Sequence, residues 1–166
     1  AELKEERLAH NCIHRSNNSF GKRIRNYPFN KAAQIKIVSF PGAEFGNGDI
    51  SIGIPKENDT ICYSKLLESI PLNLPQIDSL TDIFYNVGFS GTVYRETGLA
   101  CYDPRNAILF FDSNGKIFEY IEICFECQKT TESSNKISIG MPCEQKFDLI
   151  KKFFRKVGIK YVELKE

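Results

Sequence analysis

The segment from Cys101 to Cys127 constrains the fold of this chain more than any other. It contains an apolar, aromatic-rich run at 107–111, then Asn114-Gly115, and then a second extended run that ends at Cys127. Asn-Gly tolerates the positive φ angles that tight hairpin turns require. The pattern therefore predicts an antiparallel hairpin that carries a cysteine at each open end.

The register of this hairpin decides which side chains meet. If Asp112 faces Lys116 across the turn, then Cys101 lies opposite Cys127. Opposed strand residues have Cα atoms about 4.5–5.5 Å apart, which is a separation that a disulfide accepts. The hairpin is thus expected to bring two distant thiols together.

The same register places Glu122 opposite Asn106 and on the same face as Cys124. A carboxylate among aromatic residues can have a shifted pKa and a functional role. Pairing with a nearby cation, Arg105 or Lys116, is the simpler interpretation.

Six cysteines allow three interpretations, which the sequence leaves open. An even count favours structural disulfides and an oxidising compartment. Cys-x-x-Cys is half of a common zinc pattern, and the four candidate ligands are Cys101, Cys124, Cys127 and Cys143. On a regular ladder Cys143 lies more than about 10 Å from the Cys-x-x-Cys pair, which favours disulfides over zinc. Cys143 also opens a predicted helix, where the helix dipole can lower a thiol pKa and make the thiol reactive.

A net charge of +1 conceals an uneven distribution of charge. Residues 7–43 contain seven Lys or Arg and no Asp or Glu, whereas the chain from Glu44 onward is net acidic. Such a segment can bind an anionic partner or fold back on an acidic body. It has no recognisable nucleic-acid reader motif, so a protein partner is expected instead. The candidate binding residues are Arg15, Lys22, Arg23, Arg25 and Arg105.

Two helices follow from apolar spacing. Apolar residues recur on one face over 74–87, and Asn73 can cap that helix. A broader apolar stripe predicts a second helix over 144–157, closed by Gly158.

Strands are predicted at 34–40, 107–111, 116–125, 136–141 and 159–164, with 128–135 as a polar loop. Because helices and strands interleave irregularly, the pattern favours an α+β fold with a central antiparallel sheet. We expect residues 31–166 to form a single α+β domain, and residues 1–30 to form a basic N-terminal arm that is either part of the same domain or partly irregular. No apolar run approaches the length of a membrane span.

Part of the chain resembles a known group of proteins. The block Cys101-Tyr-Asp-Pro-Arg-Asn-Ala-Ile-Leu-Phe-Phe-Asp, then Ile121-Glu-Ile-Cys-Phe-Glu-Cys, is similar to short, uncharacterised bacterial proteins that are exported or lipid-anchored. The likeness covers residues 70–160. It implies a periplasmic or cell-envelope location and favours disulfides, but it implies no chemistry.

No complete catalytic set is readable, since both histidines lie near the start of the chain and no glycine-rich phosphate loop is present. The leading hypothesis is therefore a small exported binding protein without catalytic activity or cofactor, for example an immunity-type inhibitor of a secreted toxin. The alternative is a metal- or thiol-dependent enzyme that uses the four candidate zinc cysteines.

Overall fold

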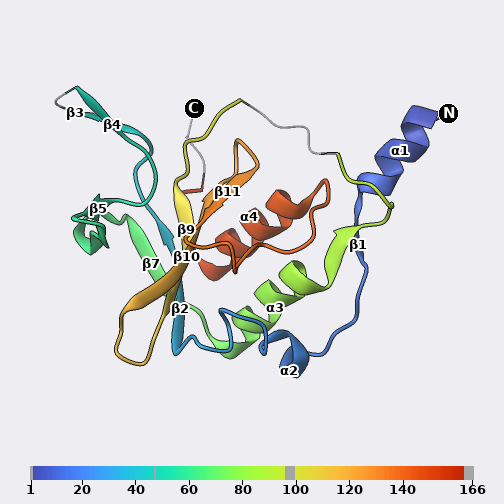
Figure 1. Cartoon of the computed structure of the whole chain (residues 1–166), viewed down its shortest axis with the longest axis horizontal. Coiled ribbons are helices and arrows are strands. Elements are labelled where there is room, and N and C mark those ends of the chain that lie inside the picture. Colours follow the sequence, from blue (N-terminus) through green and yellow to red (C-terminus); the bar gives the residue numbers. More distant parts are fainter. Residues whose placement is uncertain (1, 47, 96–99, 163–166) are drawn as a thin grey trace.

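The computed structural model describes residues 2–46, 48–95 and 100–162. Its centre is a five-stranded sheet in the order β11-β10-β9-β2-β7, in which every neighbouring pair is antiparallel (Figure 1). The fold is α+β, as the sequence predicts. The strands are β2 (Gln34–Ser39), β7 (Glu68–Pro71), β9 (Asn106–Phe111), β10 (Ile117–Cys124) and β11 (Lys129–Glu132).

Two helices, α3 (Leu74–Tyr85) and α4 (Lys146–Val157), cover one face of the sheet (Figure 1). The side chain of Asn73 caps α3 as predicted, in a reciprocal capping box with Gln76. Gly158 ends α4 with a φ of 125°. Both predicted helices are confirmed, and each is two residues shorter than predicted. The chain leaves α3 early because strand β8 (Val87–Phe89) follows at once.

A second layer covers the other face of the sheet. It consists of residues 53–67, with β5 (Lys56–Glu57), β6 (Thr60–Ile61) and a 3-10 turn, η1 (Tyr63–Lys65). The preceding strands β3 (Glu44–Gly46) and β4 (Asp49–Ser51) form a hairpin that projects away from the sheet (Figure 1). Ile54 and Ile61 from this layer pack on the buried side chains of β2 and β9. All six residues of β9 are therefore buried, which explains why its sequence is continuously apolar rather than alternating.

The N-terminal arm is built into the same body. It contains α1 (Glu2–His10), β1 (Cys12–His14) and α2 (Phe20–Arg23). Strand β1 pairs antiparallel with β8, directly after α3. At the end of α2, the buried Arg23 donates hydrogen bonds to Thr81 Oγ1 and to the Asp78 carboxylate of α3. The basic arm therefore packs along α3.

The β9–β10 hairpin begins in the predicted register, with Ile117 opposite Phe111. A β-bulge between Ile117 and Glu119 then shifts the pairing by one residue. Glu122 consequently lies opposite Ala107, and the predicted placement opposite Asn106 is wrong.

Two predicted strands are also wrong. Residues 136–141 form no strand, because β11 forms within the predicted polar loop and takes the place beside β10. Residues 159–162 form no strand either, and the remainder of that prediction lies outside the described residues.

Gly140 lies where the 138–143 loop packs closely on the backbone of α3. Its φ is +82°, and an added Cβ would overlap the backbone carbonyl of Phe84. Gly48 has the same φ of +82°, with nothing within 4 Å of the corresponding Cβ position. We expect Gly48→Ala to lower the free energy of unfolding by about 1–2 kcal/mol, because only the left-handed backbone conformation opposes the added Cβ. Gly140→Ala should cost at least about 2 kcal/mol more, because a backbone carbonyl must move. Urea unfolding of both variants measures the difference, and equal losses would contradict the close approach.

Candidate functional site

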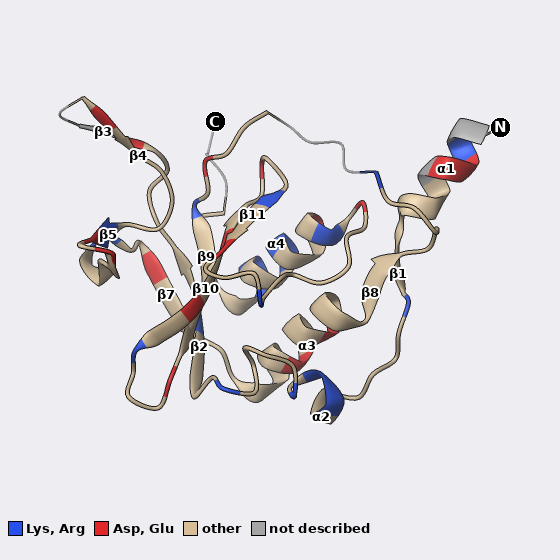
Figure 2. Ribbon diagram, viewed as in Figure 1, with Lys and Arg blue, Asp and Glu red and all other residues tan. Residues whose placement is uncertain are grey.

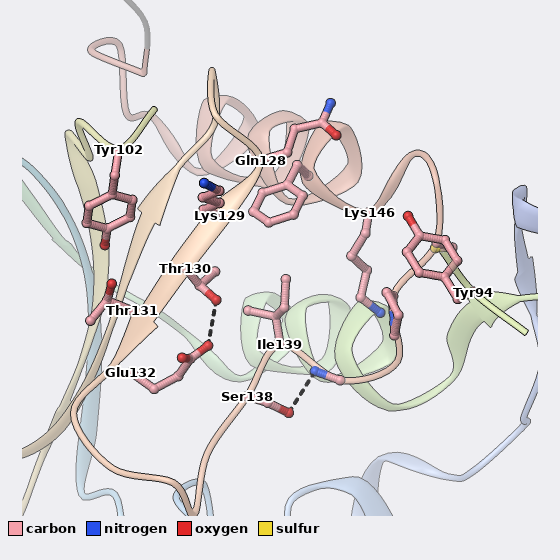
Figure 3. Close-up of a pocket in the computed structure, with 14 residues that line it drawn as sticks. Tyr94, Tyr102, Gln128, Lys129, Thr130, Thr131, Glu132, Ser138, Ile139 and Lys146 are labelled. Atoms are coloured by element: carbon pink, nitrogen blue, oxygen red, sulfur yellow. Dashed lines mark hydrogen bonds between the residues drawn. The ribbon is translucent and has the colours of Figure 1, made fainter. Parts of the chain in front are cut away.

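A groove of about 540 Å³ opens beside β11 and the start of α4 (Figure 3). All four residues of β11 line it, together with Gln128, the 138–143 loop and the first turn of α4. Tyr94 and Tyr102 complete the lining. Hydroxyl and amide groups are mixed with apolar surface from Ile139 and Phe147, which is typical of sites that bind organic ligands or peptide side chains. We call this hollow the β11–α4 groove.

Both disulfides of the described chain adjoin this groove. Cys143 lines it and is bonded to Cys12 of β1, 131 residues away, with Cα atoms 5.0 Å apart. Cys101 and Cys127 are also bonded, with Cα atoms 5.6 Å apart, and they directly precede the lining residues Tyr102 and Gln128. The walls are therefore cross-linked to distant parts of the chain, which holds the groove in one shape.

Lys146, at the start of α4, forms part of the groove wall but is almost fully buried, with 1% of the residue exposed. Its Nζ donates hydrogen bonds to the carbonyl oxygens of Ile83, at 2.6 Å, and Val87, at 2.7 Å. The Ile83 carbonyl lies in the last turn of α3, where the helix dipole favours a cation, and the Val87 carbonyl begins β8. Burial nevertheless lowers the pKa of Lys146 to about 8. The amine thus joins the end of α3 to the start of α4.

Lys146 is not among the residues predicted for a site, although its position in the sequence carried a signal. Lys146 precedes Ile150, Phe153, Phe154 and Val157 at helical spacing, so it belongs to the apolar stripe of α4. A lysine inside such a stripe must bury its amine or displace the helix. Strand β11 was missed as well, and the consecutive β-branched Thr130 and Thr131 could have indicated it.

Glu122 is a buried carboxyl on the other face of the sheet. It accepts hydrogen bonds from the backbone N–H of Ile54, at 2.5 Å, and from the Tyr102 hydroxyl, at 3.3 Å. Burial raises the pKa of Glu122, and the Ile54 and Tyr102 bonds with the nearby Lys56 only partly offset this. Burial also raises the pKa of Tyr102. Glu122 therefore anchors the second layer on the sheet, and Tyr102 links that anchor to the groove.

The candidate basic residues do not form one surface. Arg23 and Arg105 are buried, each at 6% exposure, and each forms ion pairs within the domain. Arg15 donates to the backbone carbonyls of Phe89 and Gly91 and lies over the Phe89 ring.

Arg23 and Arg105 are thus held inside the domain, where the buried Nε of Arg105 has no hydrogen-bond partner among the described residues. Their role in binding stays a prediction. Lys22 and Arg25 are exposed. In Figure 2 the cations of α2 lie on the opposite side of α3 from those of α4.

The four proposed zinc ligands do not form a common site. Cys101 is oxidised with Cys127, Cys143 with Cys12, and Cys124 is a buried free thiol on β10. Three of the four sulfurs are therefore unavailable as thiolates. In the described ranges, no group of three or more His, Cys, Asp or Glu is placed to hold a metal ion.

Comparison with known proteins finds no matching family model, no matching curated protein and no matching solved structure. None of the helices in the described part of the chain combines the length and apolar character that a membrane crossing needs. The case for function therefore depends on the site itself.

The cysteine assignment has a direct chemical test. Alkylation of unfolded, non-reduced protein should label Cys62 and Cys124 only, because the other four sulfurs are paired. In the native state Cys62 should react first, since Cys124 is buried. The chain-entropy model predicts that Cys12→Ser/Cys143→Ser lowers stability by about 5 kcal/mol and Cys101→Ser/Cys127→Ser by about 3.5 kcal/mol. Peptide mapping that finds a third labelled cysteine would contradict the pairing.

Glu122 and Glu68 should respond to pH in opposite directions. A raised folded-state pKa means that Glu122 stabilises the fold below the ordinary carboxyl pKa, and that this stability is lost as pH rises through the raised value. Glu122→Gln mimics the protonated form, so it should be more stable than the parent by about 1 kcal/mol at pH 7 and equal to it near pH 4.

Glu68 supplies the matched control. Burial alone would raise the pKa of Glu68, but hydrogen bonds from Ser39 Oγ and from the Lys160 and Tyr161 backbone outweigh it and lower that pKa. Glu68→Gln should therefore be less stable than the parent by about 1–2 kcal/mol at pH 7, with a smaller loss as pH falls. Urea unfolding between pH 4 and 7 measures both variants. Stability changes of the same sign at pH 7 in both variants would contradict the opposite pKa shifts of Glu122 and Glu68.

Proposed function

We propose that this protein is an exported, non-catalytic binding protein that holds a segment of another protein in the β11–α4 groove. The observation that carries the proposal is the cross-linking of the groove walls by two disulfides. A site already held in its binding shape loses little conformational freedom when a ligand enters, and this favours affinity.

The disulfides also support the location. Structural disulfides form and persist in oxidising compartments such as the bacterial periplasm and the cell exterior. The resemblance of residues 70–160 to exported bacterial proteins agrees with this. A periplasmic or cell-envelope location is therefore part of the proposal.

The groove chemistry favours binding over catalysis. Its one cysteine, Cys143, is in a disulfide, and its buried amine, Lys146, is hydrogen bonded to two carbonyls. Its carboxylate, Glu132, accepts from the Thr130 hydroxyl. A metal- or thiol-dependent enzyme has less support, because the cysteines on which it depends are paired or buried.

An immunity-type inhibitor of a secreted toxin is one concrete form of this proposal. Such a protein must persist outside the cytoplasm and must present a rigid surface to one partner. Both requirements fit a small, doubly cross-linked domain with a preformed groove.

Two serine variants test the groove as the binding surface. Ser138 is exposed and lines the groove, whereas Ser113 is exposed at the tip of the β9–β10 hairpin, away from it. The oxidised protein should capture a partner from the secreted and envelope fractions of its own cells. Ser138→Arg should weaken that capture at least tenfold, which corresponds to about 1.4 kcal/mol, and Ser113→Arg should not. If capture survives Ser138→Arg unchanged, the groove is not the binding surface. If the captured partner is an enzyme and this protein inhibits it, the inhibitor form of the proposal is supported.

A further inference from the structure

Backbone hydrogen-bonding groups on the outer edge of β11 have no partner among the described residues. Ser133 N donates to Tyr120 O at 3.0 Å, which extends the β10–β11 ladder by one residue. Along an antiparallel strand, the backbone N–H and C=O groups of successive residues point alternately toward the partner strand and away from it. Lys129 and Thr131 therefore face β10, and the N–H and C=O groups of Thr130 and Glu132 face outward. Within residues 2–46, 48–95 and 100–162, no strand pairs with that edge.

The other edge of the same sheet is partly blocked. Leu72 N donates to Ile35 O at 2.9 Å, so the outward positions of β7 are Ser69 and Pro71. Proline has no N–H to offer an incoming strand. Proteins usually block their sheet edges in such ways, since an open edge invites pairing with another chain. The contrast marks β11 as the edge that is open to a partner.

The β11–α4 groove runs along this open edge and has room on both faces of it. Figure 3 shows Tyr102 and Ile139 on opposite sides of Thr130. Successive side chains of an extended strand point to opposite faces of a sheet. A strand beside β11 would therefore place alternate side chains toward Tyr102 on one face and toward Ile139 and Phe147 on the other.

Charged side chains at the two ends of the β11 edge favour a pairing segment with a particular order of charges. Lys129 begins β11 and Glu132 ends it, and both side chains are partly exposed. Opposite charges on neighbouring strands stabilise the pairing, and like charges oppose it. The edge therefore favours a segment that carries an acidic residue beside Lys129 and a basic residue beside Glu132.

We propose that the partner adds an extended peptide segment to β11 as a sixth strand of the sheet, hydrogen bonded to the backbone of Thr130 and Glu132. This inference rests on the proposed function and specifies its binding mode. Main-chain hydrogen bonds supply affinity in strand addition, while the pockets for alternate side chains supply specificity. The ligand is thus an extended peptide with alternating apolar residues and one charge of each sign at its ends.

The probe is a displayed library of random twelve-residue peptides, selected on the oxidised protein, and the best binder is then synthesised. Thr130→Pro removes an outward N–H while leaving the bonds between β10 and β11 in place. Ser69→Pro makes the same change at an outward position of β7 and is the matched control. The expected result is at least a tenfold loss of peptide affinity for Thr130→Pro and no change for Ser69→Pro.

A second measurement uses the unaltered protein, so it stands even if Thr130→Pro fails to fold. Each residue of the selected peptide is N-methylated in turn, which removes one N–H at a time. Strand addition predicts that affinity falls at every second position. A ligand bound as a helix would instead lose affinity at nearly every position after its first turn, because those N–H groups bond within the helix itself, and this result would overturn the proposal.

The remaining outcomes are also decisive. Peptide binding that is lost with Ser138→Arg but unaffected by Thr130→Pro and free of a two-residue period would overturn strand addition, yet it would leave the groove as a binding site. Failure of any selected peptide to bind at 100 µM, about 5.5 kcal/mol, would overturn the proposal, and the capture experiment would then judge the proposed function separately. Concentration-dependent dimerisation that Thr130→Pro abolishes would identify a second copy of this chain as the occupant and would overturn the partner-peptide mode.

Discussion

Burial of strand β9 on both of its faces is the constraint on which the rest of this structure depends. Its side chains contact α3 and α4 on one face and the second layer on the other. Because β9 is central, β2 and β10 must pair on its two sides, and the remaining strands can only occupy the edges. The open edge at β11 is therefore a consequence of where the core lies.

The β11–α4 groove depends on three connections between segments of the chain. The Cys12–Cys143 disulfide holds the 138–143 loop against β1, and the Cys101–Cys127 disulfide holds the turn before β11. Lys146 joins α4 to the Ile83 carbonyl of α3 and the Val87 carbonyl of β8. Each connection places a wall of the groove, and two of them, the Cys12–Cys143 disulfide and the Lys146 bonds, link residues that are far apart in the sequence. The site is thus a property of the whole domain and not of one motif.

Local patterns predicted the elements with strong periodicity. The helices at α3 and α4, the Asn73 cap and the β9–β10 hairpin all follow from short-range spacing and turn chemistry. Prediction failed where two segments with weak strand patterns could each occupy the same position beside β10. The segment at 136–141 and β11 could both continue the sheet, and the residues nearest the β10 turn took that position. The bulge near Glu119 left no sequence signal strong enough to reveal the register shift.

The sequence by itself determined the α+β class, the hairpin that brings Cys101 to Cys127, and the two helices, because each depends on residues within about 25 positions of one another. Only the tertiary structure decided that Cys143 pairs with Cys12, that Arg23 and Arg105 are buried, and that β11 keeps an unpaired edge beside a groove. These features depend on which distant surfaces meet when the core closes. Packing of the whole core decides which surfaces come into contact, and no single stretch of the chain encodes that packing.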